Sequence, residues 1–294
     1  MWNDLRYFFR ISRPVNVLIS LVAFGIACFL STGHRLDFLE DFSFWATGCT
    51  ICVIAAAGYW INDAHDFRID RINKPGRTIV NTYLSVKKVI TAYLLANMGI
   101  LLFSFLYFTL YLGKGNITFI NLVSVLLLFI YASWLKRISM AGNLVISFLI
   151  VLVLVLAYYL YGRLTMPLIW AMVFAFEITF IREITKDIQD IKGDLAYHLR
   201  TLPIQIGVRQ TRRVLDVLYT SLIVTCYCPF VIRYLDSGEY IWTYLGLSVF
   251  LVQIPALGLV WRMHHTAEPE AYGSLSQGLK FLMLSGMITL FFLM

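Results

Sequence analysis

At residues 62–71 the chain reads Asn62-Asp63-Ala64-His65-Asp66-Phe67-Arg68-Ile69-Asp70-Arg71. This polar stretch follows directly on an apolar run that ends at Ile61. Its three acids are spaced i, i+3 and i+7, which places them on one face if the segment is helical. A second acidic triad has the same spacing and consists of Asp187, Asp190 and Asp194. Two matched acidic faces in one chain indicate a common site.

The rest of the chain is strongly apolar. Its 294 residues are 60% hydrophobic and 14% charged, with a mean hydropathy of +0.76, whereas soluble domains carry about 25% charged residues. Several apolar runs reach the roughly 20 residues needed to cross a bilayer. We therefore predict an all-α, polytopic membrane protein that forms one domain over residues 1–294. The predicted spans are about 15–31, 42–62, 88–112, 117–135, 143–161, 167–186, 213–235, 240–261 and 275–293.

Basic residues orient these nine transmembrane helices. Of the 24 Lys and Arg residues, only four fall on the side opposite the N-terminus: Arg35, Lys114, Arg163 and Arg233. The positive-inside rule therefore predicts a cytoplasmic N-terminus. Both acidic loops, about 62–85 and 187–211, then lie at the cytoplasmic face. The net charge of +7 is explained by orientation in the membrane, so nucleic acid is not an expected partner.

The two acidic loops are the one internal repeat of the chain, and they suggest two halves that face each other across a central cavity. Clustered carboxylates repel one another, and a divalent cation offsets this repulsion. Oxygen ligands favour Mg²⁺, which shares its coordination with substrate phosphates. We expect Asp63, Asp66, Asp187 and Asp190 to bind the metal and act in catalysis, with Asn62 as a neutral ligand. Asp70 and Asp194 complete the predicted metal site, either by binding the metal through water or by holding nearby cations.

Basic residues accompany the acids on the same side of the membrane. Arg binds phosphate through two hydrogen bonds and Lys acts as a point charge, so acids and bases together indicate a diphosphate site. The bases that we assign to substrate binding are Lys74, Arg77, Lys136, Arg182, Lys186 and Arg200. The membrane setting and an aromatic-rich interior imply a long apolar tail; the aromatic residues are Tyr59, Trp60, Tyr131, Trp134, Tyr158, Tyr159, Tyr161, Trp170, Phe174 and Phe176. A prenyl diphosphate satisfies both requirements, since its ionisation gives an allylic cation that aromatic faces stabilise and a nucleophile captures.

These residues carry a resemblance to a known family. The two acidic motifs with Arg77, and the entry Arg13-Pro14-Val15-Asn16 to the first span, resemble the UbiA superfamily of intramembrane prenyltransferases over nearly the whole chain. Tyr131-Ala132-Ser133-Trp134-Leu135-Lys136 is similar to a family element in which Tyr and Lys approach the diphosphate. The resemblance implies substrate-binding roles for Asn16 and Tyr131.

Within the superfamily, two further segments point to a particular branch. Residues 70–75 and 182–194, followed by Arg200-Thr201-Leu202-Pro203-Ile204, most resemble the geranylgeranylglyceryl phosphate geranylgeranyltransferases. This implies Mg²⁺-dependent transfer of a geranylgeranyl group from its diphosphate to a hydroxyl of an amphipathic lipid precursor.

Other functions stay open from the sequence. An aromatic, quinone-precursor or chlorophyll-type acceptor is the alternative within the same chemistry. A cation-coupled transporter is the non-enzyme alternative, but transporters bury acids near the middle of the membrane, whereas these acids follow the ends of spans. Phosphatidyl-type transferases also use Asp motifs, but their D-G-x-x-A-R element is absent from the sequence.

Overall fold

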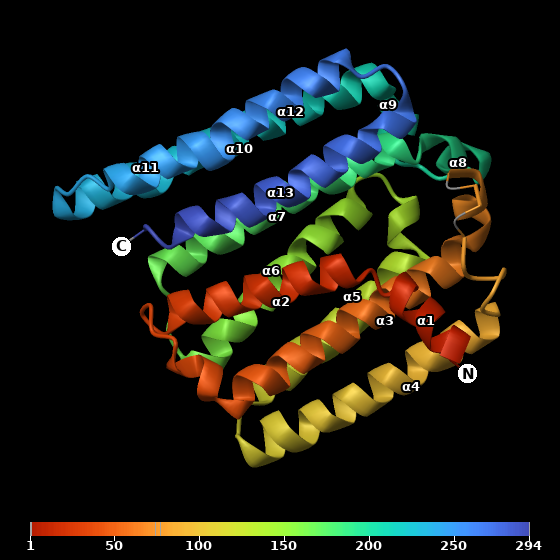
Figure 1. The fold of residues 1–294 in the computed structure, drawn as a ribbon, viewed down its shortest axis with the longest axis horizontal. Helices are drawn as coiled ribbons and strands as arrows, with labels where there is room; N and C mark the ends of the chain where they lie inside the picture. The colour runs from red at the N-terminus through yellow and green to blue at the C-terminus, as the bar shows by residue number, and fades with distance from the viewer. Residues whose placement is uncertain (1, 74, 77, 294) are drawn as a thin grey trace.

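The structure is a computed structural model that describes residues 2–73, 75–76 and 78–293, and these residues are almost wholly helical (Figure 1). The long helices are α2 (Pro14–Ser31), α3 (Phe42–Asn73), α4 (Val86–Ser104), α5 (Gly115–Ser133), α6 (Ala141–Tyr161), α7 (Met166–Gln189), α10 (Val208–Ser237), α12 (Ile254–His265) and α13 (Tyr272–Leu290). The shorter helices are α1 (Trp2–Ile11), α8 (Ile191–Ala196), α9 (Leu202–Ile206) and α11 (Trp242–Ser248). Three 3₁₀ turns, η1 (Asp37–Glu40), η3 (Leu135–Arg137) and η5 (Pro269–Ala271), join some of them.

All nine predicted spans coincide with helices, two of which contain a π-helical segment. The π-segment η2 (Phe105–Tyr111) extends α4, and η4 (Val249–Gln253) joins α11 to α12. Within the described residues, seven helices are long and apolar enough to cross a membrane. The predicted spans that do not qualify are α7, which carries Arg182 and Glu183, and α13, which carries Lys280. The count of nine membrane crossings therefore stays a prediction.

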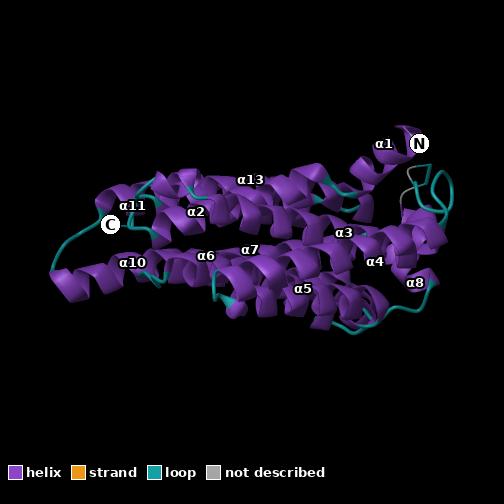
Figure 2. Cartoon of the chain, turned by 90° about the horizontal axis from the view of Figure 1, so that it is seen from below, coloured by secondary structure: helices purple, strands orange, loops and turns teal. Residues whose placement is uncertain are grey.

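The helices pack side by side with a common long direction. In Figure 1, α10 to α12 form one edge and α4 the other, with α7, α13, α2 and α3 between them. Figure 2 shows two layers, with α2 and α13 in one and α5, α6 and α10 in the other. The C-terminal end of α3 and the short helix α8 lie at the same end of the bundle, so both acidic motifs are at that end.

The outer surface is apolar over the middle of the bundle. Leu95, Met98, Phe250 and Phe281 are each at least 65% exposed, an arrangement that is unfavourable in water but expected for helices in contact with lipid. Inside, one buried cluster contains Phe24, Phe108 and Tyr244, and a second joins α7, α10, α12 and α13.

The acidic motifs differ from each other in local structure. Helix α3 continues through Asn73, so the first triad lies on one unbroken helix and the predicted loop over 62–85 begins only after that residue. Helix α7 ends at Gln189, where Asp190 forms the C-cap, and Asp194 lies on α8. The expectation of a second acidic face on one helix is therefore wrong, because the chain turns between the first and third acids.

Candidate active site

The first acid of the α3 triad is paired with the start of α2. Asp63 Oδ1 accepts a hydrogen bond from Arg13 Nη2 at 2.7 Å. Arg13 adopts a left-handed conformation (φ 51°) at the N-cap of α2, directly before Pro14. Its guanidinium carbon also lies 4.7 Å from the centre of the Tyr59 ring, one helical turn before Asp63. The turn between α1 and α2 therefore places a cation against the acidic face of α3.

The second acid of the triad is paired with Lys136. Lys136 and Asp66 form an ion pair in which the two side chains are 11% and 15% exposed. Burial lowers the pKa of Lys136 to about 8, although the nearby carboxylates of Asp194 and Asp63 act in the opposite direction. Gly142 packs against this segment: a Cβ atom there would lie 3.0 Å from both Lys136 Cα and Tyr131 Cε2. The small residue on α6 thus allows the Tyr131–Lys136 segment to approach α3.

The end of α7 supplies a second group of charges. Asp187 Oδ2 accepts a hydrogen bond of 2.7 Å from Asn143 Nδ2 on α6. Burial raises the pKa of Asp187 to about 8; the charges of Asp194 and Glu183 act in the same direction, and the bond from Asn143 opposes them. A carboxyl group in such a setting is stabilised in its charged form by a nearby cation.

Glu183 lies one turn before Asp187 and is 5% exposed. Its two oxygens accept hydrogen bonds from Arg182 Nη1 at 2.6 Å and from Lys186 Nζ at 2.7 Å. Glu183 therefore holds two cations at the end of the apolar part of α7.

A direct contact joins the two acidic motifs. Asn73, the last residue of α3, accepts a hydrogen bond of 2.7 Å from the backbone N–H of Gly193 on α8. A Cβ atom at position 193 would lie 2.5 Å from the Asn73 amide. Glycine is therefore required for this approach, and the contact sets the distance between the two motifs.

A polar pocket of about 90 Å³ lies where these elements meet. Most of the sequence-predicted site residues line it, namely Asn62, Asp66, Asp70, Tyr131, Lys136, Lys186, Asp187, Asp190 and Asp194. Asp63 instead lines a neighbouring pocket of about 310 Å³ together with Arg10, Arg13 and Asp70. The predicted Lys74 and Arg77 lie outside the described residues. Arg200 is exposed and does not line the polar pocket, so its role in substrate binding stays a prediction.

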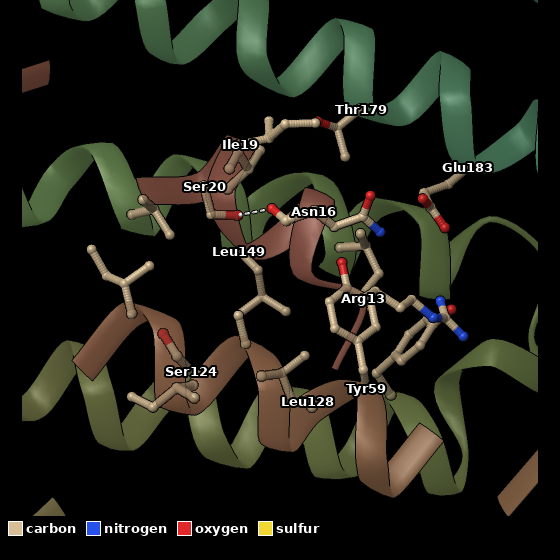
Figure 3. A pocket seen from close by; sticks show the side chains of 18 of the residues that line it. Arg13, Asn16, Ile19, Ser20, Tyr59, Ser124, Leu128, Leu149, Thr179 and Glu183 are labelled. Carbon is tan, nitrogen blue, oxygen red and sulfur yellow. Dashed lines mark hydrogen bonds between the residues drawn. The ribbon is translucent and has the colours of Figure 1, made fainter. Parts of the chain in front are cut away.

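A larger cavity of about 200 Å³ continues from the polar pocket into the bundle (Figure 3). The two share five lining residues: Arg13, Asn62, Tyr131, Glu183 and Lys186. Arg182 and the predicted Asn16 also line the cavity. Figure 3 shows Thr179 and Glu183 extending into it from α7, opposite Leu128 and Ser124 on α5. Its deeper walls are aliphatic, with Ile51, Ile54, Leu149, Ile150, Val153 and Leu156.

Most of the aromatic residues that the sequence assigned to the interior do not line this cavity. Among the described residues that line it, Tyr59 and Tyr131 are the aromatic ones, and both lie at the polar end. Trp134 is 61% exposed, and Phe174 lines a different pocket of about 40 Å³. Aromatic content alone could not separate residues that face the cavity from those that face lipid or the core.

Several site residues were not predicted to belong to it. Arg13 was interpreted only as part of a motif, and Asn143 and Lys280 were not singled out, yet Lys280 lines the large cavity from α13. A signal was present for Lys280, because it is the single charged residue of α13, and an ionisable residue within a membrane span usually serves function. Asn143, an amide near the start of an apolar helix, gave a weaker signal.

The residues at the polar end fit a magnesium ion. Their donors are carboxylates and an amide, the hard oxygen ligands that Mg²⁺ prefers. Asn62 Oδ1 is buried without a hydrogen-bond partner among the described residues. No preformed group of three His, Cys, Asp or Glu side chains is found in the described part of the chain. The pairing of Asp63 with Arg13, Asp66 with Lys136 and Asp187 with Asn143 accounts for this, because each acid is turned toward its own partner.

Comparison with known proteins gives consistent results. The model of the UbiA prenyltransferase family matches residues 18–284. A digeranylgeranylglyceryl phosphate synthase from Korarchaeum cryptofilum is 31% identical over 260 residues, which cover 87% of this chain and 85% of the relative.

Solved structures share the fold. One, from a study of digeranylgeranylglyceryl phosphate synthase in membranes, has a TM-score of 0.69 and 22% identity, and covers 98% of this chain and 97% of its own. A UbiA homologue from Archaeoglobus fulgidus bound to DMAPP and Mg²⁺ has a TM-score of 0.65 and 14% identity, and covers 96% and 98%.

Proposed function

The chain belongs to the UbiA prenyltransferase family, and from this premise we propose that it transfers a geranylgeranyl group from geranylgeranyl diphosphate to a hydroxyl of a phosphate-bearing lipid precursor such as geranylgeranylglyceryl phosphate. One observation carries the proposal: an acid-lined polar pocket shares five lining residues with an apolar cavity. A prenyl diphosphate has the same two parts, a charged head and an apolar tail. Relatives named for digeranylgeranylglyceryl phosphate synthesis support this acceptor.

The residues of the polar pocket bind and orient the diphosphate. Lys136 and Lys186 supply positive charge, and Tyr131 supplies a hydroxyl group. Asn62 and the acids Asp63, Asp66, Asp70, Asp187, Asp190 and Asp194 are the proposed metal ligands. Mg²⁺ held by these ligands would supply the positive charge that neutralises the departing diphosphate.

The bond between C1 of the prenyl group and the diphosphate oxygen breaks, and the acceptor oxygen forms a new bond to C1 while its proton is released. The Tyr59 and Tyr131 rings lie at the polar end of the cavity, where their faces stabilise the positive charge on the prenyl group. The aliphatic walls exclude water, which would otherwise capture the cation.

The proposed membrane arrangement follows the charge distribution. We propose one domain over residues 1–294 with nine crossings, in which α7 and α13 also span the bilayer and direct their charged residues into the cavity. The N-terminus and the polar pocket then face the cytoplasm. Labelling single cysteines with a membrane-impermeant reagent tests this: Asn81→Cys is expected to react only from the cytoplasmic side and Ser237→Cys only from the other.

The function is tested with purified protein in liposomes, radiolabelled geranylgeranyl diphosphate, Mg²⁺ and geranylgeranylglyceryl phosphate. We expect an ether-linked product, no product with EDTA, and recovery on addition of Mg²⁺. Asp66→Ala and Asp187→Ala are expected to lower kcat by at least about 100-fold, while an exposed acid far from the pocket, Glu239→Ala, leaves it unchanged. Activity that survives EDTA contradicts the metal–diphosphate mechanism, and product formed only with aromatic acceptors contradicts the assigned acceptor.

A further inference from the structure

The wall of the large cavity carries more positive than negative charge. Arg13, Arg182, Lys186 and Lys280 line it, and they come from the N-cap of α2, from α7 and from α13. Glu183 is the acid among the described lining residues. The charges that act on Lys280 are mainly those of Arg182, Lys186 and Arg13, with Glu183 as the opposing one.

Three of these four cations already have an acidic partner. Arg13 is paired with Asp63, and Glu183 accepts hydrogen bonds from both Arg182 and Lys186. Lys280 makes no hydrogen bond or ion pair with any residue that the structure describes. A cation without a partner is costly beside an aliphatic cavity, so Lys280 requires an anion from elsewhere.

Two further donors near Lys280 also lack partners. Arg182 Nε and Thr179 Oγ1 are buried and have no hydrogen-bond partner in the described part of the chain. Thr185 on the same helix shows the usual alternative, since its hydroxyl donates to the Ile181 carbonyl at 2.8 Å. Thr179 and Arg182 are one turn apart on the face of α7 that lines the cavity. A hydroxyl, a guanidinium N–H and an ammonium group that line the cavity therefore lack a hydrogen-bond acceptor among the described residues.

This group is separate from the polar pocket that we assign to the diphosphate. Arg182, Thr179 and Lys280 line the large cavity and do not line the acid-rich pocket. An anion held here needs no metal, because the group contains cations and a hydroxyl but no free acid. The arrangement suits a second, smaller anion.

We propose that Lys280, together with Arg182 and Thr179, forms an anion-binding subsite for the phosphate of the acceptor lipid. The inference rests on the proposed function and extends it, because it explains how one protein holds a diphosphate and a phosphate monoester at once. The subsite selects acceptors that carry a phosphate over neutral glycerol ethers. It also positions the acceptor hydroxyl relative to C1 of the prenyl group.

The test compares Lys280→Met with Lys280→Arg and with the control Lys87→Met, an exposed lysine on α4. Each is assayed with geranylgeranylglyceryl phosphate and with its dephosphorylated counterpart. We expect Lys280→Met to raise KM for the phosphorylated acceptor about tenfold or more. KM for the donor and KM for the neutral acceptor are expected to stay within about twofold, and Lys280→Arg to restore phosphate selectivity.

Other outcomes overturn the inference. If KM for the donor rises with both acceptors, Lys280 binds the diphosphate instead. If Lys280→Met matches Lys87→Met in every respect, the cluster binds no substrate. Failure of the wild-type protein to prenylate any glycerol ether contradicts the proposed function, and a binding measurement then tests the subsite independently.

That measurement uses glycerol 1-phosphate as the probe, with EDTA present to exclude metal-bridged binding. The probe is expected to raise Tm of the wild-type protein in detergent, and to raise Tm of Lys280→Met markedly less. Lys280→Gln serves in place of the methionine variant if the latter does not purify as a monodisperse protein. Equal shifts of Tm in both proteins overturn the proposal.

Discussion

At the scale of single residues, Glu183 determines how two cations are held at the mouth of the cavity. Its side chain is 6% exposed and accepts hydrogen bonds from Arg182 and Lys186. Because this one buried carboxylate is the acceptor for both cations, its removal leaves both without a charged partner. Glu183 thus keeps an otherwise repulsive pair of cations within reach of the substrate.

Glu183→Gln is therefore expected to destabilise the protein. We expect a loss of about 1–3 kcal/mol in the free energy of unfolding, seen as a lower Tm in detergent. The matched control is Glu177→Gln on the same helix, where Ser221 and Thr225 donate hydrogen bonds that an amide oxygen accepts equally well. Equal losses of Tm in the two variants contradict the argument.

Asn143 acts on the metal site through Asp187. Its amide fixes one carboxylate oxygen at 2.7 Å, and residues that orient a metal ligand commonly change metal affinity 10–100-fold when mutated. For Asn143→Ala we expect the Mg²⁺ concentration for half-maximal activity to rise about tenfold. Ser147→Ala, one turn along α6, is the control, because its hydroxyl donates to the Asn143 carbonyl and does not touch an acid. An unchanged Mg²⁺ requirement in Asn143→Ala means that Asn143 does not orient the ligand.

At the scale of elements, α3 and α8 are held together by the contact between Asn73 and Gly193. The 2.5 Å separation that a Cβ at position 193 would have from the Asn73 amide is too short for any real contact. The Asn73 side chain or the chain around it must then shift, which disturbs the hydrogen bond between the two motifs. The relative placement of the two acidic motifs thus depends on Asn73 and Gly193, neither of which is an acid.

Gly193→Ala is expected to lower kcat about tenfold or more, since a displacement of the order of 1 Å at a site costs up to about 100-fold. Replacing Asn73 by Ala in the same protein removes the clashing side chain, so the double variant is expected to recover part of the activity. Initial rates of the two single variants and the double variant measure this coupling. Gly99→Ala on α4 is the control, because its Cβ would meet nothing within 4 Å. Strictly additive losses contradict a direct contact.

Much of the helical arrangement could be predicted from the sequence. An apolar run of membrane length is visible in the local sequence, without knowledge of the helices that it packs against. The break between α7 and α8 could not, since Asp187, Asp190 and Asp194 have the spacing of one helical face. The turn at Asp190 places Gly193 on α8 and against Asn73, a contact between residues far apart in the chain that local spacing does not reveal. The charged residues of α7 and α13 make these two helices harder to predict as membrane spans. The same residues, Arg182, Lys186 and Lys280 among them, line the cavity.

At the scale of the whole molecule, the site is assembled from segments far apart in sequence. The acids could be predicted because their spacing is local. Their partners could not, since the pairs Arg13–Asp63 and Lys136–Asp66 join α3 to the N-cap of α2 and to η3, segments far away in the chain. The same holds for Lys280, which reaches the cavity only because α13 packs against α7.

The depth of the cavity limits the length of the prenyl chain that the donor can carry. Along α5 the lining runs from Tyr131 to Asn121, a distance of about 15 Å at the helical rise of about 1.5 Å per residue. Ser124 lies about 10 Å below Tyr131 on the same scale, with its side chain in the cavity (Figure 3). A large side chain there fills the lower part of the cavity and leaves the polar end intact.

Ser124→Phe is therefore expected to raise KM for geranylgeranyl diphosphate about tenfold, since overpacking costs about 1–3 kcal/mol. Geranyl diphosphate, with a tail half as long, ends above the new ring, so its KM is expected to change less than about twofold. Steady-state kinetics with both donors measures the ratio. Leu122→Phe is the matched control, because Leu122 is on the same helix but 42% exposed at the outer surface. Equal impairment with both donors contradicts the argument, since it means that the substitution disturbs the polar end, and that the tail does not descend along α5.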